Sequence, residues 1–288
     1  MPFVVMLVVS LAAGLLAWAV ARRLEGHRPA QAAAREVDDA LGDAGVESPA
    51  VRTGAALTAA VVCVAVAGVV LGALSLLVRR QSAPASIDRG AADWAHDHAV
   101  GWSTDLLTAV TDVGQPWSAS AIAAVFAVAM AIRMRDRWIV PFMLLAVGGT
   151  SLLTTLLKVA IDRVRPTLNP LAETLGPSFP SGHTSYSAAT FAAMALVLGR
   201  SRDGRTRAVL AGAAVALAVA VGATRVLLRV HWVSDVVAGL ALGWAWFAVS
   251  AVAFGGRILR FGAGARRPRP GTPPGSSSPP PRGAAPSR

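Results

Sequence analysis

Six side chains that could bind and transfer a phosphoryl group lie in three short clusters of an otherwise apolar chain. They are three cations, two imidazoles and one carboxylate: Lys158 and Arg165 in the first cluster, His183 in the second, and Arg225, His231 and Asp235 in the third. Phosphoryl transfer needs positioning and stabilisation of the charge on the phosphoryl oxygens, which arginine and lysine provide. An imidazole can attack phosphorus when it is neutral, or donate a proton when it is charged.

The third cluster contains a histidine and a carboxylate four residues apart, His231 and Asp235. On a helix this spacing places both side chains on one face. Asp235 could then accept the Nδ1 proton of His231, fix the tautomer and leave the Nε2 lone pair available for attack on phosphorus. The alternative is a histidine at the membrane interface with only a local hydrogen bond to its neighbour.

The cations Lys158 and Arg165 lie at the end of an apolar segment, and Arg225 precedes the His231 pair. Pro166 disfavours continuation of the helix, so both long side chains of the first cluster can reach back to one site. There the guanidinium groups would offer planar pairs of donors and the lysine a point charge. Alternatively, the cations extend to lipid headgroups. Arg163 shares this ambiguity and is a second-rank candidate.

The second cluster, Pro180-Ser181-Gly182-His183, stands at the start of a predicted helix. Ser181 is expected to cap this helix, and Gly182 to permit close approach of a ligand to the backbone. Backbone N–H groups at a helix N-terminus form an anion site. His183 would stand beside a bound phosphate and could protonate a leaving alcohol. A plain helix start with a surface histidine is the alternative.

The elements that must position these clusters are hydrophobic helices. The chain has 288 residues, of which 54% are hydrophobic and 15% charged, and its mean hydropathy is +0.55. Several apolar runs exceed the roughly 18 residues that cross a bilayer, and they lack the alternation of a membrane β-barrel. We therefore predict an all-α, polytopic membrane protein. Cys63 is the only cysteine, so it is expected to be a packing residue without a disulfide.

Seven membrane-spanning segments are predicted, at about 2–21, 55–78, 117–132, 138–160, 183–198, 208–228 and 232–254. Between the second and third, apolar residues at helical spacing from Ile87 to Val110 predict amphipathic helices on the outer membrane surface. Arginines follow the first, third and fifth segments, and placing them in the cytoplasm puts all three clusters outside. Arg79 and Arg80 oppose this assignment.

The predicted organisation has four parts. They are an N-terminal transmembrane helix at 1–21, a polar cytoplasmic linker at 22–54, a six-helix core at 55–254, and a disordered, basic, Pro-rich cytoplasmic tail at 255–288. The first segment is interpreted as an uncleaved helix because its arginines follow the apolar run, although small residues near Ala17 leave cleavage open. The formal charge of +11 comes from loops and tail, so no nucleic-acid partner is expected.

Other polar and aromatic residues receive structural interpretations. Asp93, His96, Asp97 and His98 could be imagined as a metal site, but adjacent positions of a helix point apart. The tryptophans near predicted span ends are interpreted as interfacial anchors; they are Trp94, Trp102, Trp117, Trp138 and Trp232.

The three clusters together resemble the three-part signature of the type 2 phosphatidic acid phosphatase superfamily. These are membrane lipid phosphatases related to vanadium haloperoxidases. The resemblance rests on Lys158 to Pro166, Pro180 to His183, and Arg225 to Asp235, and it covers about residues 55–254. One departure is visible, because the family usually has serine before the third-cluster arginine and this chain has Thr224. Threonine keeps the hydroxyl, so little loss is expected.

The resemblance implies a role for each matched residue. His231 would be the nucleophile, with Asp235 as its partner and His183 as the general acid. The phosphate would be bound by five residues: Lys158, Arg165, Ser181, Gly182 and Arg225. No metal and no cofactor are implied.

The expected reaction is hydrolysis of a lipid phosphate at the outer face of the cytoplasmic membrane through a phosphohistidine. Substrates of the phosphatidate, phosphatidylglycerol phosphate or polyprenyl pyrophosphate type fit equally, since nothing in the sequence specifies the lipid or an oligomeric state. Two alternatives are a lipid-linked phosphotransferase with the same site and a lipid-phosphate transporter without chemistry.

Overall fold

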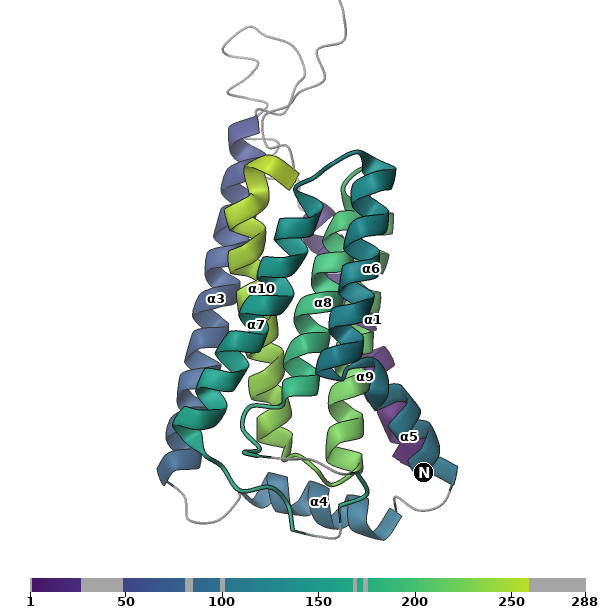
Figure 1. The fold of residues 1–288 in the computed structure, drawn as a ribbon, viewed down its shortest axis with the longest axis vertical. Coiled ribbons are helices and arrows are strands. Elements are labelled where there is room, and N and C mark those ends of the chain that lie inside the picture. Colours follow the sequence, from purple (N-terminus) through teal and green to yellow (C-terminus); the bar gives the residue numbers. More distant parts are fainter. Residues whose placement is uncertain are drawn as a thin grey trace, which may run out of the picture.

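The computed structural model describes residues 2–26, 49–80, 85–98, 102–167, 170–172 and 176–258, and its regular elements there are all α-helices. In chain order they are α1 (Pro2–Gly26), α3 (Pro49–Arg80), α4 (Ser86–His98), α5 (Trp102–Val113), α6 (Pro116–Met134), α7 (Ile139–Ile161), α8 (Gly182–Gly199), α9 (Gly204–Leu227) and α10 (Val233–Ile258). The long helices form a bundle (Figure 1). The predicted all-α fold is thereby confirmed.

Six of these helices are long and apolar enough to cross a membrane: α1, α3, α6, α7, α9 and α10. The segment predicted as the fifth of seven spans, at 183–198, forms α8, which falls outside this set because its first half is rich in serine and threonine. That half is buried, and α8 packs against α6, α7, α9 and α10. Protein groups rather than lipid therefore surround its hydroxyls, which suits polar side chains within a helix bundle.

Glycines on α10 bring it into close contact with α8. A Cβ atom added at Gly239 would lie 2.7 Å from the carbonyl oxygen of Ser181, and one at Gly243 would lie 2.5 Å from that of Ser185. Both distances are too short for a real side chain, so only glycine allows the two backbones this approach. The contact holds the start of α8, which carries the second cluster, against the N-terminal half of α10. The first turn of α10 carries Asp235 of the third cluster.

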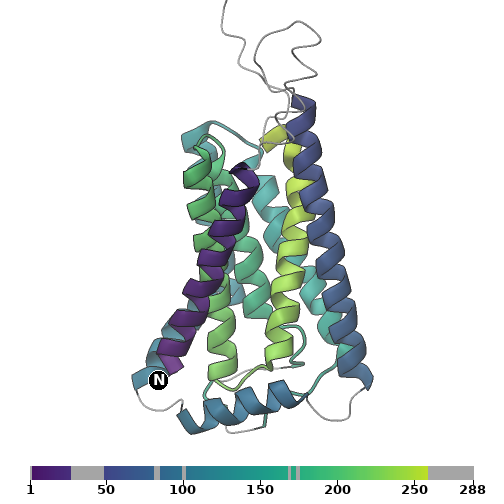
Figure 2. The same ribbon diagram turned by 180° about the vertical axis from the view of Figure 1, so that it is seen from behind.

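The two ends of the bundle differ in what they carry. At one end α4 lies across the helix ends, and the N-terminus, the α7–α8 connection and the α9–α10 turn are at this same end (Figures 1 and 2). The α6–α7 and α8–α9 turns lie at the other end. We call these the α4 end and the opposite end. All three clusters belong to the α4 end, while the arginines at 133–137 and 200–207 belong to the opposite end.

Helix boundaries differ somewhat from the predicted segments. The first helix continues through Arg22 and Arg23 to Gly26, and α3 begins at Pro49, within the predicted linker. The amphipathic helices predicted between the second and third spans are confirmed as α4 and α5. The rest of the linker, at 27–48, and the tail at 259–288 lie outside the described residues.

Candidate active site

His231 and Asp235 contact each other as their spacing predicts, but not on one helix. His231 lies in the turn before α10, and Asp235 lies in the first turn of that helix. The His231 Nδ1 and Asp235 Oδ2 atoms are 3.3 Å apart, and the same Oδ2 accepts a hydrogen bond from the Trp232 backbone N–H at 3.0 Å. Both side chains are buried, with 2% and 0% exposure. The predicted common helix face is thus wrong, whereas the predicted pairing is right.

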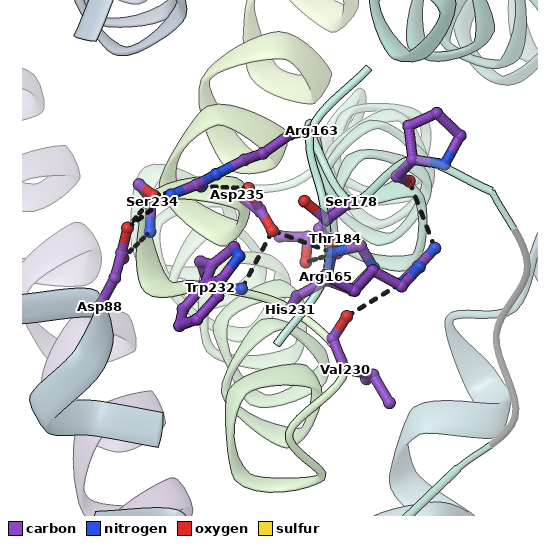
Figure 3. Close-up of polar contacts among 12 residues, drawn as sticks. Asp88, Arg163, Arg165, Ser178, Thr184, Val230, His231, Trp232, Ser234 and Asp235 are labelled. Carbon is purple, nitrogen blue, oxygen red and sulfur yellow. Dashed lines mark hydrogen bonds and ion pairs between the residues drawn. The ribbon is translucent and has the colours of Figure 1, made fainter. Parts of the chain in front are cut away.

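The other ring nitrogen of His231 faces Arg165. Arg165 Nη1 lies 3.2 Å from His231 Nε2. Figure 3 shows the two side chains and the carbonyl contacts of Arg165. Because arginine can only donate, a hydrogen bond here requires an unprotonated Nε2, and the ring proton then belongs on Nδ1, where it donates to Asp235. Burial lowers the pKa of His231 to about 4, against the opposing effect of the Asp235 carboxylate. The imidazole is therefore neutral at neutral pH, with its Nε2 lone pair directed at a cation.

Arg165 and Lys158 are both held by the loop that joins α7 to α8. Arg165 donates to the carbonyls of Gly176 at 2.8 Å, of Pro177 at 3.3 Å and of Val230 at 2.8 Å. The Lys158 ammonium donates to the carbonyl of Pro177 as well. Shared carbonyl acceptors thus bring the two cations of the first cluster together beside the third cluster.

The second cluster has the predicted location but a different hydrogen-bond pattern. Ser181 occupies the N-cap position of α8, yet its hydroxyl makes no capping bond and instead accepts from the Thr184 hydroxyl at 2.9 Å. The Ser181 N–H donates to the Asp235 carbonyl at 3.0 Å, which ties α8 to α10. Side-chain capping by Ser181 was therefore a wrong prediction. Its backbone N–H is likewise already used.

Gly182 and His183 begin α8 next to the cations. A Cβ atom at Gly182 would make only ordinary van der Waals contacts, with Thr154 Cγ2 at 3.8 Å, Tyr186 Cε2 at 3.9 Å and Lys158 Cε at 4.0 Å. Gly182 therefore lies beside the lysine side chain, with room for a methyl group. The His183 imidazole interacts electrostatically with four side chains of the other two clusters, namely Arg225, His231, Arg165 and Lys158.

Arg225 is buried at the end of α9 and is oriented by a residue from α5. Its Nη1 donates to the Thr111 hydroxyl at 3.0 Å, and the two residues are 2% exposed. Within the described residues, no hydrogen bond is assigned to the Nε of Arg225. Thr111 thus holds one nitrogen of the guanidinium, while its other N–H groups can still donate to a ligand.

Three further residues border the site: Arg163, the second-rank candidate, and Asp88 and Trp232, which the sequence interpretation did not place there. Asp88 of α4 is 1% exposed and forms an ion pair with Arg163 at 2.9 Å, and Arg163 forms another with Asp235 at 2.6 Å. Trp232, interpreted as an interfacial anchor, is only 8% exposed and donates from its indole to the Val164 carbonyl at 3.0 Å. The burial of Asp88 could have been predicted from the sequence. Asp88, Ala92 and Ala95 follow the i, i+4, i+7 spacing of one helix face, and all three are buried.

A metal can be weighed against the same residues. No group of three or more His, Cys, Asp or Glu side chains that could hold a metal ion occurs among the residues that the structure describes. His96 is engaged by Arg229 at 2.6 Å, and His98 stacks on Trp94, so these α4 histidines have other contacts.

The fold and the site define a polytopic membrane protein with cations and a carboxylate-oriented histidine at one end of a helix bundle. Residues 139–258 match the model of the PAP2 superfamily. Phosphatidylglycerophosphatase B of Bacillus subtilis (strain 168) is 33% identical over 147 residues, which are 49% of this chain and 70% of that protein. The chain belongs to the PAP2 superfamily and is a lipid phosphatase of that family.

Two further comparisons agree with this assignment. Lipid A 1-phosphatase of Rhizobium johnstonii is 38% identical over 122 residues, 39% of this chain and 46% of that relative. The crystal structure of a transmembrane PAP2-type phosphatidylglycerolphosphate phosphatase from Bacillus subtilis superposes with a TM-score of 0.62 and 27% identity, over 69% of this chain and 98% of that one. The predicted family and enzyme class are thus confirmed.

Proposed function

We propose that this protein hydrolyses the phosphate ester of a membrane lipid through a phosphohistidine on His231, at the extracytoplasmic face of the membrane. The observation that carries the proposal is the position of the buried His231 ring between Asp235, on Nδ1, and Arg165, on Nε2. A neutral ring with a fixed tautomer has a lone pair to offer, and Arg165 supplies positive charge where the phosphoryl oxygens would lie.

In the first step the His231 Nε2 lone pair attacks phosphorus and the bond from phosphorus to the ester oxygen breaks. Burial and the cations around His183 disfavour a proton on its ring before substrate binds, and the negative charge of a bound phosphate would offset them. With the substrate in place, protonated His183 donates its proton to that oxygen, so the lipid leaves as a neutral alcohol. Lys158, Arg165 and Arg225 would stabilise the charge on the transferring oxygens. Asp235, hydrogen-bonded to Nδ1, would stabilise the positive charge that the ring acquires.

In the second step water attacks the phosphohistidine. His183, now neutral, accepts a proton from the water, the bond between phosphorus and Nε2 breaks, and the electron pair returns to the ring. Inorganic phosphate is released, and His231 is again neutral and His183 again protonated. A pyrophosphate substrate follows the same steps with a lipid phosphate as the leaving group.

The extracytoplasmic orientation is supported by the charges at the two ends of the bundle. Arg22 and Arg23 and the arginines at 133–137 and 200–207 lie at the opposite end from the site. Arginines of short loops favour the cytoplasm. A membrane-impermeant thiol reagent tests this in right-side-out vesicles on a Cys63→Ala background. Asp93→Cys, on the exposed side of α4, should be labelled, and Arg202→Cys should not.

The substrate is proposed to be a phosphorylated lipid of the kinds that the named relatives indicate, a glycerophospholipid phosphomonoester or a glycolipid 1-phosphate. A polyprenyl pyrophosphate is the third member of the test panel. Phosphate release by the purified protein in detergent, measured on all three, decides between them. Product analysis with added acceptor lipids separates hydrolysis from transfer.

The decisive experiment replaces the nucleophile. His231→Ala should abolish turnover, and radiolabelled phosphate trapped by a rapid alkaline quench should be found on His231 in the wild-type protein. His98→Ala is the matched control, because this histidine is exposed on α4 and, among the described residues, hydrogen-bonds to and stacks on Trp94. Turnover by His231→Ala near the wild-type rate would overturn the mechanism.

A further inference from the structure

We propose that Asp88 of α4 and Arg163 of the α7–α8 loop are positioning residues that hold Asp235 in the orientation His231 requires. The inference rests on the proposed function and adds two residues to its site. Arg163 lies between the two cations of the first cluster but is not one of them, and Asp88 comes from a helix outside the three clusters.

Asp88 is a buried carboxylate whose two oxygens are both occupied. Its Oδ1 accepts from the Ser234 backbone N–H at 2.9 Å, and its Oδ2 accepts from the Ser234 hydroxyl at 2.6 Å and from Arg163 Nη2 at 2.9 Å. The Ser234 N–H belongs to the first turn of α10, where N–H groups lack partners within the helix. Asp88 therefore fixes the start of the helix that carries Asp235, from another element of the bundle.

Arg163 connects this carboxylate to Asp235. Its Nη1 donates to Asp235 Oδ1 at 2.6 Å and to the Ser234 hydroxyl at 2.7 Å, while its guanidinium carbon stands 5.6 Å from the centre of the Trp232 ring. Figure 3 shows the arginine lying between the two carboxylates. With Oδ1 taken by Arg163, the Oδ2 of Asp235 is directed at His231 and at the Trp232 N–H. The two oxygens of one carboxylate thus have separate partners, which sets its rotation.

The charges in this arrangement give Asp88 a second effect. Arg163 alone beside Asp235 would neutralise the carboxylate that is meant to stabilise a positive imidazole. Asp88 contributes a further negative charge to the same guanidinium, so the three groups together carry a net negative charge beside His231. Nη2 of Arg163 pairs with Asp88 and Nη1 pairs with Asp235, and the Arg163 side chain is 10% exposed. These contacts assign Arg163 to positioning rather than to the phosphate, the role for which the sequence made it a second-rank candidate.

This arrangement couples α4 to catalysis. α4 packs across the ends of α9 and α10, and through Asp88 it reaches two residues that are 75 and 146 positions away in the sequence. The docking of this helix is then part of the completed site and not only a cover over it. Partners that orient a metal-ligating histidine cost about 10- to 100-fold in affinity or activity when they are removed, and we expect a loss of that order in kcat here.

The test is a double-mutant cycle with Asp88→Asn, Arg163→Gln and the double variant, assayed with the lipid phosphate that the wild-type protein turns over fastest. Asp93→Asn is the matched control, since Asp93 is exposed on the same helix. We expect each single variant of the pair to lower kcat about 10- to 100-fold, with little change in the inhibition constant of inorganic phosphate. The double variant should lose less than the two single losses combined, because Asp88 acts in part through that arginine. Ser234→Ala, which keeps the backbone contact, should lose less than Asp88→Asn.

The outcomes are separable. Wild-type protein without turnover on any lipid phosphate overturns the proposed function and the inference with it. Wild-type turnover with unchanged kcat in Asp88→Asn overturns the inference alone, as does a loss that is additive in the double variant. A purely structural role predicts equal kcat per folded molecule with reduced thermal stability, and this result also counts against positioning. If Asp88→Asn does not fold, Ser234→Ala and Arg163→Gln carry the same comparison.

Discussion

The Nε2 atom of His231 lies 3.2 Å from Nη1 of Arg165, so the proposed nucleophile and a cation proposed to bind the phosphate are in direct contact. An incoming phosphoryl group would take over that N–H while its phosphorus meets the Nε2 lone pair. The same contact disfavours a proton on Nε2, because a protonated ring and a guanidinium would each point a donor at the other. Nucleophile activation and phosphate binding thus share one hydrogen bond.

The pH dependence of kcat/KM should report the burial of His231. Its pKa of about 4 in the folded protein means that the neutral, reactive ring persists through neutral pH and is lost as the pH falls through about 4. The acid limb of the profile should therefore lie near this value. In Asp235→Asn the carboxylate that raises the His231 pKa is absent, so the limb should move to lower pH while kcat falls. The substrate phosphate has its own second pKa of about 6, which is common to both proteins and cancels in the comparison. An acid limb at the same pH in wild-type protein and in Asp235→Asn would contradict an effect of this carboxylate on the pKa of His231.

Gly182→Ala should separate activity from stability. The new methyl group meets no atom closer than 3.8 Å and projects toward Lys158, so the fold has room for it. Gly182 is the first residue of α8, so the substitution removes no hydrogen bond within the helix. We expect an unchanged melting temperature together with a higher KM, because the methyl occupies space that the phosphate needs. A variant with wild-type KM would show that the phosphate does not approach Gly182.

The clusters and the helices were predictable from sequence because both depend on local patterns. Apolar runs predict spans, and charged residues at their ends predict where a polar site can form. The partners of those residues could not be predicted from the sequence. Thr111 and Arg225 are 114 positions apart, and Asp88 and Ser234 are 146 apart. Contacts of this range depend on how helices pack, which spacing alone does not encode.

Two local details also departed from prediction for structural reasons. His231 lies outside α10 because the chain turns sharply between α9 and α10, where Arg229 adopts a positive φ of 60°. Ser181 makes no capping bond because its hydroxyl is taken by Thr184. The first departure follows from the turn between two helices and the second from a local hydroxyl contact within α8, and the contact between His231 and Asp235 is present all the same.

Thr111→Val should weaken phosphate binding. The substitution keeps the shape of the side chain and removes the hydroxyl that accepts from Arg225 Nη1 at 3.0 Å. A hydrogen bond to a charged group contributes roughly 1.5–3 kcal/mol, so we expect about tenfold or more in KM or in the inhibition constant of phosphate. Thr111→Ser retains the hydroxyl and is the control. Equal behaviour of the two variants would exclude an orienting role for the hydroxyl.

Gly239→Ala should destabilise the contact between α8 and α10. Its methyl would lie 2.7 Å from the Ser181 carbonyl oxygen and 3.0 Å from Thr184 Cβ, so the helices must separate. Overpacking of this kind costs about 1–3 kcal/mol. Gly148→Ala on α7 is the matched control, because a Cβ there meets nothing within 4 Å. Of these two variants, only Gly239→Ala should show a lower melting temperature when thermal unfolding is measured in detergent. Its activity should also fall, because Ser181 and Asp235 are joined across this contact.

His183→Ala should reveal the role of the second imidazole through the leaving group. A general acid matters most when the departing alkoxide is basic, and little when it is already stable as an anion. We therefore expect a large loss of kcat/KM with an alkyl phosphate, such as the lipid itself, and a small loss with an aryl phosphate whose leaving group is a weakly basic phenolate. Breakdown of the phosphohistidine still needs His183 as a base. The first step should therefore be isolated by the burst of the released leaving group, which is an alcohol or a phenol. Equal losses in that burst for good and poor leaving groups would assign His183 to phosphate binding rather than to proton transfer.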